Sequence, residues 1–598
     1  MNNLRWLRPY LRRHRGTLIL GFLIAALSSG ASTISPYLLR RAVDDLNSRG
    51  VDLGRLGLLG LLILGAAAIN GILNFGQRNI IGSVSYRIEY ALRGDLFRKL
   101  LDLDQDFYGS SHTGDLMARA TNDLSAVRQF LGPGLTSVAS SGLTLIVCAA
   151  WMLIIDVPLA LVTLILLPLI TITFVAIRQP MRTRFTKVQE QFGELSTHAQ
   201  ENFSGIRTIK AYAQEEAEIA DFLQANRDYQ RLNLRFVLLS GVLWPLMALL
   251  MGLTTGLILL LGGQAVASGR LTLGEFVQFN AYLGVLSWPM ISLGWTVTLY
   301  QQGSASMGRI AEVLNRQPLI KSPTAPAPLT RIRGDIRFED VGVRYGNTWI
   351  VRHISFEVPV GGSLAIVGAT GAGKTTLVNL IGRVRDPAEG RVLIDGYDVR
   401  DLPLDLLRRS VGYVPQDTFL FSLPLRENVE FGRADRPSQT EFEDALLVSQ
   451  LVNDLPQFPE GMETMLGERG VTLSGGQKQR TAIARAILRD PAVLILDDAL
   501  SSVDTHTAAE ILRHLRRVMV GRTTIIIAQR IATVKDADEI IVIDDGEIVE
   551  RGVHSELVRT DGHYAAMYRR ELLREEMSDN GRDELQTSVR NDGHGTRV

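Results

Sequence analysis

The sequence has a single cysteine, Cys148, in a chain of 598 residues. One thiol cannot form a disulfide within the chain or a cysteine-based zinc site, so neither kind of cross-link stabilises the fold. An excess of charge of one sign is also lacking, because 63 Lys and Arg residues balance 63 Asp and Glu residues. This balance gives no sign of a nucleic-acid partner.

Long apolar runs are absent from the second half of the sequence, whereas they fill the first half. A bilayer core requires about 20 mainly apolar residues per helix. Six segments meet this requirement, and buried helices of soluble proteins are usually shorter and more interrupted. The predicted spans are residues 17–38, 56–76, 136–155, 157–177, 236–263 and 271–299.

The N-terminus, MNNLRWLRPYLRRHR, is basic like a signal peptide. However, the apolar stretch that follows is too long, and no small-residue cleavage site ends it. We expect an uncleaved first span preceded by an amphipathic segment on the inner membrane surface. Residues 78–135 and 178–235 are also rich in Arg, whereas the alternate loops carry only Asp156 and Arg270. This asymmetry places both chain ends in the cytoplasm and the spans in the cell membrane.

The two Arg-rich segments are nearly 60 residues each, which is too long for simple turns. Their pattern predicts long cytoplasmic helical extensions of the spans, broken at Gly109–Gly114 and around Gly205. The sixth span also carries a polar and aromatic set that suits a substrate path and ordinary helix packing equally well. The set is Gln278, Asn280, Tyr282, Ser287, Trp288 and Trp295.

Four prolines between residues 318 and 328 prevent a helix from continuing there and indicate a domain boundary. After it, short β-rich runs alternate with helical patterns, which predicts an α/β domain with a mainly parallel sheet. We therefore expect a transmembrane domain over 1–317, a linker over 318–333, an ATP-binding domain over 334–573 and a polar tail over 574–598.

A glycine-rich motif follows the apolar strand SLAIV and opens a helix. It matches the phosphate-binding pattern G-x-x-x-x-G-K-[ST], whose glycines let backbone N–H groups surround phosphates. Lys374 is expected to reach the β- and γ-phosphates of ATP, and Thr375 to ligate Mg²⁺. The predicted ATP-binding residues are Gly368, Ala369, Thr370, Gly371, Ala372, Gly373, Lys374, Thr375 and Thr376.

A second apolar strand, beginning at Leu494, ends in two carboxylates, Asp497 and Asp498. Asp497 suits Mg²⁺, directly or through water, and Asp498 is placed where a base could face an attacking water. Acidic strand ends are common, so this pattern alone is moderate evidence.

The motif Leu473-Ser474-Gly475-Gly476-Gln477 precedes a helical pattern, and Ser474 is predicted to be its N-cap. The N–H groups and the positive dipole end of such a helix form a second phosphate-binding surface. Because the glycine-rich loop already provides one, this surface is expected to serve another nucleotide. Two half-sites in one chain imply a dimer.

With these motifs, the chain resembles an exporter-type ABC half-transporter along nearly its whole length. The resemblance implies a six-helix transmembrane domain fused to an α/β P-loop ATP-binding cassette, with each ATP held between the glycine-rich loop of one chain and the LSGGQ motif of the other. It implies that Tyr345 stacks on adenine, that Gln416 senses Mg²⁺ and cargo, and that Asp504 contacts the partner chain. Leu466–Gly470 resembles the exporter X-loop.

The resemblance also assigns a role to the breaks in the inner segments. Phe107–Tyr108 with Thr113–Asp115 resembles the first coupling helix, and Glu201–Asn202 with Gly205–Tyr212 the second. Without the resemblance, both would be solvated helix-turn segments.

Two residues depart from the family pattern. The usual catalytic Glu is replaced by Asp498, and the usual switch His by Gln529. Gln529 can hydrogen-bond a γ-phosphate, but it cannot become cationic as histidine does. The combination resembles the degenerate subunit of heterodimeric multidrug or lipid exporters, in which the partner supplies the intact Glu and His.

The sequence therefore predicts ATP-driven export of a hydrophobic or amphipathic compound, with a second half-transporter and membrane lipid as partners. An ATP-gated or regulatory subunit and a homodimeric exporter stay open as alternatives. Fusion of the spans to the ATP-binding domain argues against an importer. The transported compound is left undetermined.

Overall fold

The computed structural model describes residues 3–47, 53–433, 435–467 and 473–573. The chain divides into two compact units, which we call the helical unit (Met1–Asp102 with Ser110–Gln317) and the sheet unit (Leu103–Gly109 with Pro318–Val598). The predicted tail, 574–598, and residues 468–470 of the predicted X-loop lie outside the described residues.

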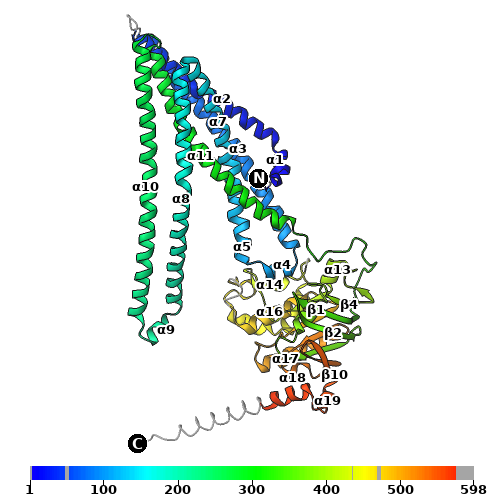
Figure 1. The fold of residues 1–598 in the computed structure, drawn as a ribbon. Helices are drawn as coiled ribbons and strands as arrows, with labels where there is room; N and C mark the ends of the chain where they lie inside the picture. The colour runs from blue at the N-terminus through cyan, green and yellow to red at the C-terminus, as the bar shows by residue number, and fades with distance from the viewer. Residues whose placement is uncertain (1–2, 48–52, 434, 468–472, 574–598) are drawn as a thin grey trace. The chain divides into compact units, whose positions relative to one another are not determined.

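The helical unit consists of long helices joined by short breaks (Figure 1). Its elements are η1 (Asn3–Leu7), α1 (Arg8–Arg13), α2 (Arg15–Asn47), α3 (Leu53–Asp102), α5 (Thr113–Ala118), η2 (Arg119–Asp123), α6 (Leu124–Gln129), η3 (Phe130–Gly134), α7 (Leu135–Ile155), α8 (Val157–Ser204), α9 (Ile206–Ala211), α10 (Glu215–Ala267) and α11 (Leu273–Asn315).

The first five predicted spans each lie within one of these helices, and the sixth begins just before α11, but the count of six is not confirmed. Among the residues that the structure describes, five helical stretches are long and apolar enough to cross a membrane: Arg15–Asn47, Leu53–Asp102, Thr113–Ile155, Val157–Ser204 and Glu215–Ala267. The sixth predicted span, 271–299, lies mostly in α11, which is not among the five. In the most apolar part of α11, residues such as Ser287, Trp288 and Pro289 lower the mean hydropathy.

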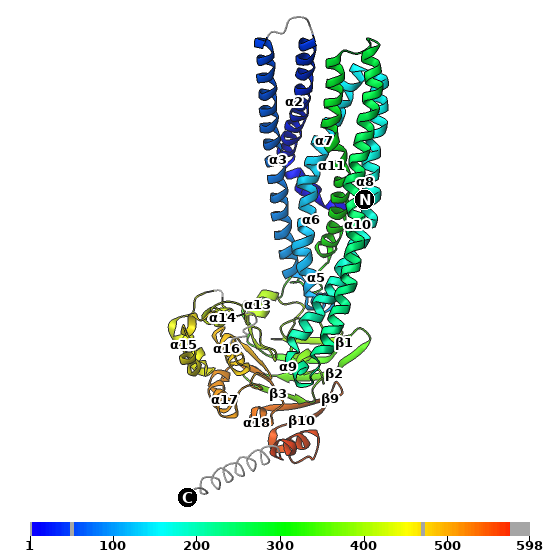
Figure 2. The ribbon, with the colours of Figure 1, turned by 90° about the vertical axis from the view of Figure 1, so that its left-hand side faces the viewer.

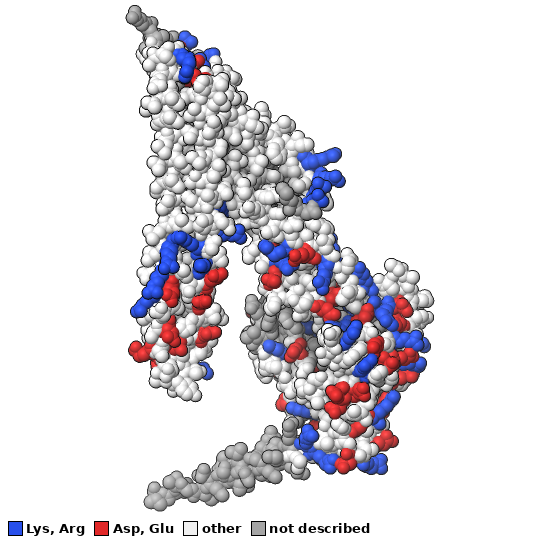
Figure 3. All heavy atoms as spheres, viewed as in Figure 1, with Lys and Arg blue, Asp and Glu red and all other residues white. Residues whose placement is uncertain are grey.

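The breaks in the inner segments lie where the glycines predict them. The helix α4 (Gln105–Ser110) ends just before α5, and Gly205 separates α8 from α9. Figures 1 and 2 both show α8 and α10 running side by side, with α9 between their ends. On the face drawn in Figure 3, charged side chains are scarce over the middle of the helical unit and gather at its ends.

The polar and aromatic set of the sixth span divides between two environments. Gln278 and Tyr282 are buried; Gln278 Nε2 donates to the Tyr282 hydroxyl at 3.0 Å, which donates to the Thr33 carbonyl at 3.2 Å. Tyr282 joins α11 to α2 through this hydrogen bond, whereas Gln278 bonds within α11 and its Oε1 has no partner among the described residues. Trp288 and Trp295 are 69% and 41% exposed, and Asn280 is exposed too, so this part of the set is open to a ligand.

The sheet unit contains two sheets. A four-stranded antiparallel sheet has the order β2 (Thr348–Val358), β1 (Ile336–Tyr345), β4 (Glu389–Ile394), β5 (Tyr397–Asp398). A six-stranded sheet has the order β10 (Glu547–Gly552), β9 (Glu539–Asp544), β3 (Ser363–Gly368), β8 (Thr523–Ile527), β7 (Val493–Asp497), β6 (Val411–Val414). All its pairs are parallel except β10–β9, which confirms the predicted mainly parallel sheet. The antiparallel sheet was not predicted.

Helices cover the larger sheet, and both of its faces are buried. Along β3, Leu364 and Ile366 belong to one hydrophobic core, and Ala365 and Val367 belong to another. The helices of this unit are α12 (Lys374–Val378), α13 (Leu404–Arg409), α14 (Leu425–Glu430), α15 (Gln439–Val448), η4 (Leu451–Gln457), η5 (Gly461–Glu463), α16 (Gly475–Leu488), α17 (Thr505–Met519), α18 (Ile531–Val534) and α19 (His554–Leu557).

Because β3, β7 and β8 are parallel neighbours, their carboxyl ends meet at one edge of the sheet. Ligands of open α/β sheets bind at such an edge. It carries Gly368 at the end of β3, Asp497 at the end of β7 and Gln529 just after β8.

Candidate active site

The glycine-rich loop leaves β3 at Gly368 and enters α12 at Lys374, as the motif predicts. Gly373 is the N-cap of α12 and has a φ of 90°. A Cβ there would lie 2.4 Å from Val351 Cγ1, and a Cβ on Gly368 would lie 2.1 Å from the Ile543 carbonyl oxygen. These two positions therefore require glycine for close packing as well as for backbone conformation.

The side chain of Lys374 is folded onto its own loop. Its Nζ donates to the carbonyl oxygens of Gly368 and Ala369 at 2.9 and 2.7 Å, and the residue is buried. Burial lowers its pKa, while the nearby carboxylates of Asp497 and Asp498 oppose that shift. An ammonium group between these carbonyls and carboxylates is placed to pair with a bound phosphate.

Asp497 is 1% exposed, and burial raises its pKa. Its Oδ2 accepts a hydrogen bond from the Tyr413 hydroxyl at 3.2 Å, whereas its Oδ1 has no partner among the described residues. Thr375 hydrogen-bonds the same carboxyl group. A buried oxygen without a partner is costly unless something binds it, and a carboxylate beside a hydroxyl is an oxygen ligand set that suits Mg²⁺. The residues present therefore fit the ion.

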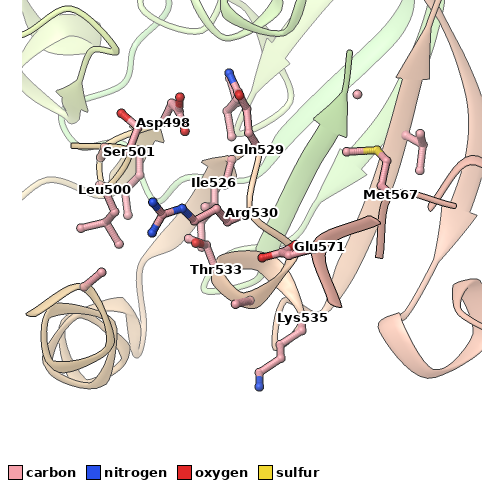
Figure 4. A pocket seen from close by; sticks show the side chains of 18 of the residues that line it. Asp498, Leu500, Ser501, Ile526, Gln529, Arg530, Thr533, Lys535, Met567 and Glu571 are labelled. Atoms are coloured by element: carbon pink, nitrogen blue, oxygen red, sulfur yellow. The ribbon is translucent and has the colours of Figure 1, made fainter. Parts of the chain in front are cut away.

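Asp498 and Gln529 lie together at one end of the pocket drawn in Figure 4. Asp498 has a φ of 47°, and its backbone N–H donates to the Ile527 carbonyl at 2.8 Å. Burial raises the pKa of the Asp498 carboxyl, and a hydrogen bond from the Gln529 backbone opposes the shift. These contacts hold Asp498 and Gln529, the two residues that depart from the family pattern, next to each other.

A cavity of about 170 Å³ brings most of the predicted residues together. Residues from the glycine-rich loop, the end of β7 and the segments after β6 and β8 line it. Those predicted from the sequence are Thr370, Gly371, Gly373, Lys374, Thr375, Thr376, Gln416, Asp497, Asp498 and Gln529. A larger pocket of about 1020 Å³ includes Gly368 and Ala369 and also reaches Asp498 and Gln529.

The signature residues lie elsewhere in the sheet unit. Ser474 is the N-cap of α16, as predicted: its Oγ accepts from Gln477 N at 3.3 Å, and Gln477 Oε1 accepts from Ser474 N at 3.0 Å. Among the described residues, none of the four from Ser474 to Gln477 lines the 170 Å³ cavity. The glycine-rich loop and the signature motif of one chain therefore do not form one closed site.

Tyr345 and Asp504 also lie outside that cavity. Tyr345, at the end of β1, is 51% exposed. Asp504 is the N-cap of α17 and accepts from Thr507 N at 2.9 Å, which lowers the pKa of its carboxyl. Leu466, the first residue of the predicted X-loop, is buried.

Two comparisons of sequence identify the family. Residues 18–290 match the family described as ABC transporter transmembrane region, and residues 351–501 match the family described as ABC transporter. A probable multidrug resistance ABC transporter ATP-binding/permease protein of Bacillus subtilis, YheI, is 37% identical over 90% of this chain and 92% of its own length. The chain belongs to the ABC transporter family.

Other relatives of this ABC transporter agree. An ATP-dependent lipid A-core flippase of Syntrophus aciditrophicus is 33% identical over 94% of this chain and 93% of its own. The structure of a bacterial Atm1-family ABC exporter with ATP bound is similar with a TM-score of 0.77 and 29% identity, covering 94% of this chain and 98% of that one. The protein is thus a membrane transport ATPase that uses ATP with Mg²⁺.

Residues Leu103–Gly109, which include Phe107 and Tyr108 of the predicted first coupling helix, belong to the sheet unit. Asp106 of α4 forms an ion pair with Arg385, whose guanidinium carbon lies 3.8 Å from the centre of the Tyr345 ring. Asp104 accepts from Leu319 N at 2.8 Å. Neither Arg385 nor Tyr413 is predicted as a site residue from the sequence. Tyr413 lies in VGYVPQ beside a predicted site residue, but no local pattern shows which carboxylate it reaches.

Gly373→Ala is expected to weaken ATP binding about tenfold more than Gly371→Ala does. Both glycines have a φ near 90°, so alanine is strained at each, but only the Cβ at Gly373 meets Val351; nothing lies within 4 Å of a Cβ at Gly371. The measurement is equilibrium binding of a fluorescent ATP analogue to the full-length protein. Equal affinities of the two variants would contradict the close packing of this loop.

Proposed function

We propose that this chain is one half of a heterodimeric ABC exporter and carries a degenerate ATP site. The observation that carries the proposal is that most motif residues keep the family pattern, whereas two do not. The phosphate loop, the Mg²⁺ carboxylate Asp497 and the signature N-cap Ser474 keep the family pattern. The two residues next to the reacting phosphate, Asp498 and Gln529, do not.

A nucleotide held between two chains fits the geometry. The cavity of about 170 Å³ contains Lys374 and Asp497 but, in the described part of the chain, none of the residues from Ser474 to Gln477. The N-terminus of α16, outside this cavity, offers N–H groups to a second nucleotide. In a head-to-tail dimer, each chain supplies its glycine-rich loop to one ATP and Ser474–Gln477, or their equivalents, to the other. Tyr345 then stacks on adenine, and Asp504 contacts the partner.

Hydrolysis transfers the γ-phosphoryl group of ATP to water and yields ADP and inorganic phosphate. Bound Mg²⁺ would neutralise phosphate charge, held by Thr375, Asp497 and Gln416. Lys374 pairs with the β- and γ-phosphates, and Asp498 accepts the proton of the attacking water. Asp498 is one methylene shorter than Glu, and a misplacement of about 1 Å costs on the order of 100-fold in rate. Hydrolysis at this chain's own site is therefore slow, and the partner's Glu and His run the other site.

The transport path is proposed to consist of six spans, with α11 as the sixth, in a domain over 1–317. The linker (318–333), the ATP-binding domain (334–573) and both chain ends face the cytoplasm. The compound exported is hydrophobic or amphipathic. The multidrug and lipid relatives support this class, as do the exposed Trp288 and Trp295 of α11.

Two other functions remain as rivals. A slow own site is also expected of an ATP-gated or regulatory subunit, and a homodimer would place two slow sites in one exporter. Purification of the tagged chain from its native membrane separates the homodimer from the heterodimer. A second, non-identical ABC chain in equal amount supports the proposal, and self-association alone contradicts it.

Export itself is tested in sealed inside-out vesicles that contain the complex. We expect ATP-dependent accumulation of an amphiphilic dye or a fluorescent short-chain phospholipid against its gradient, abolished when the partner's catalytic Glu is neutralised. A passive, ATP-gated flux that stops at equal concentrations would favour the channel-like rival.

A further inference from the structure

Gln479 lies in the first turns of α16, four residues after the signature residue Gly475, and it is 3% exposed. A buried amide needs partners for both its N–H groups and its oxygen. All the partners of Gln479 lie in one segment, 498–502, which follows β7. The signature helix and the end of the catalytic strand are therefore joined through this one side chain.

Three hydrogen bonds make the connection. Gln479 Nε2 donates to Ser501 Oγ at 2.9 Å and to the Asp498 carbonyl at 3.3 Å, and Gln479 Oε1 accepts from Ser502 N at 2.9 Å. Both N–H donors and the oxygen of the amide are thus hydrogen-bonded. Because the segment is bound at three points, it cannot move independently of α16 without leaving buried polar groups unpaired.

The signature glycines pack on the same segment. A Cβ on Gly475 would lie 3.2 Å from Ser502 Cβ, and a Cβ on Gly476 would lie 3.0 Å from the Ser502 carbonyl oxygen. These distances leave no room between the signature turn and Ser502. A displacement of Ser502 must therefore displace the N–H groups that α16 presents to a nucleotide.

Segment 498–502 ends at Ser502, beside the signature turn, and begins with Asp498. The Asp498 backbone N–H is bonded to Ile527 of β8, and its carboxylate accepts from the Gln529 backbone. Figure 4 shows Asp498, Ser501 and Gln529 around one end of the same pocket. A continuous set of contacts thus runs from Gln529 through Asp498 and Gln479 to the signature turn.

We propose that Gln479 is a positioning residue that couples the two ATP sites of the dimer. The proposal rests on the head-to-tail arrangement given under Proposed function. Occupancy of this chain's own site sets the position of segment 498–502, and Gln479 passes that position to Ser474–Gly476, which complete the partner's site. Gln479 touches no reacting atom.

The first test replaces Gln479 by methionine, which keeps the length of the side chain and removes all three hydrogen bonds. We expect kcat for ATP hydrolysis by the assembled complex to fall about tenfold, the rate equivalent of one lost buried hydrogen bond, with KM changed less than about twofold. Gln439→Met is the matched control, because Gln439 is an exposed helix glutamine bonded only to Glu443 of its own helix. It should change neither constant.

The decisive measurement is a double-mutant cycle with Lys374→Ala, which empties this chain's own site. In the otherwise unmodified complex, Lys374→Ala should lower turnover at the partner's site about tenfold; in the Gln479→Met complex, it should lower it less than about twofold. A purely structural role predicts that the two factors multiply, and that result would overturn the proposal. So would a Lys374→Ala variant with full turnover.

Ser501→Ala covers the case in which Gln479→Met does not fold. It removes one of the three hydrogen bonds and should reduce the same coupling partially, with no further effect when combined with Gln479→Met. Unchanged coupling in folded Ser501→Ala and Gln479→Met complexes would contradict the inference alone. Failure of the unmodified complex to export would contradict the proposed function instead.

Discussion

Ser474→Ala should lower ATP hydrolysis at the partner's site about 100-fold while changing this chain's own site less than about twofold. The Ser474 hydroxyl caps α16 by accepting from Gln477 N, and the glycines that follow it present the first free N–H groups of the helix. Without the cap, the first turn can fray, and a shift of about 1 Å at a reacting phosphate costs on the order of 100-fold.

The experiment is vanadate-dependent trapping of a photoreactive ATP analogue, with the labelled chain identified by mass spectrometry. Label attached to the partner's glycine-rich loop should fall, while label attached to this chain's loop should not. Ser438→Ala is the matched control, because Ser438 caps α15 with the same capping box, formed with Glu441. Each variant should lose about 1 kcal/mol of stability from the cap, so a difference between them reports on the site. Equal loss of both labels would contradict the head-to-tail arrangement.

Asp498→Glu combined with Gln529→His should raise ATP hydrolysis at this chain's own site about tenfold, less than the roughly 100-fold that a shift of about 1 Å is worth. The longer side chain moves the carboxylate one methylene toward the phosphate, and a histidine can exchange protons at neutral pH. Backbone strain at position 498 opposes this gain in hydrolysis. Asp498 has a φ of 47°, a conformation that Asp tolerates better than Glu, so the gain will be smaller than a simple extension suggests.

Turnover at this site alone is measured in a complex whose partner carries a neutralised catalytic Glu. The strain is isolated with Asp545→Glu, because Asp545 is exposed and has a φ of 46°. That control should lower the thermal unfolding temperature slightly and leave hydrolysis unchanged. No gain in the double variant, with ATP binding intact, would mean that Asp498 and Gln529 are not what makes the site slow.

If both results hold, a single chain contributes unequally to two sites. Its own phosphate loop binds a nucleotide that turns over slowly, while its signature helix completes the site that turns over fast. Asp498 and the signature turn are joined through Gln479 within the same sheet unit. Slow release at one site can then influence the rate at the other.

The sequence alone determined what depends on neighbours along the chain. Apolar runs marked the long helices, the glycine-rich motif marked the turn from β3 into α12, and Ser474 with Gln477 marked the start of α16, because each depends on hydrogen bonds or burial within a few residues. It also identified Asp498 and Gln529, since a substitution in a motif is visible without coordinates.

Only the tertiary structure decided which distant groups meet. It buried Gln278 and Tyr282 against α2 and placed Tyr413 on Asp497. It also left one oxygen of Asp497 without a partner in the described chain, and it directed Gln479 at Ser501 and Ser502. The antiparallel sheet of β2, β1, β4 and β5 likewise depends on pairing between separated strands. The side-chain contacts between elements join residues 22 to 249 positions apart, and the pattern of one strand or helix carries no information about which partner it will find.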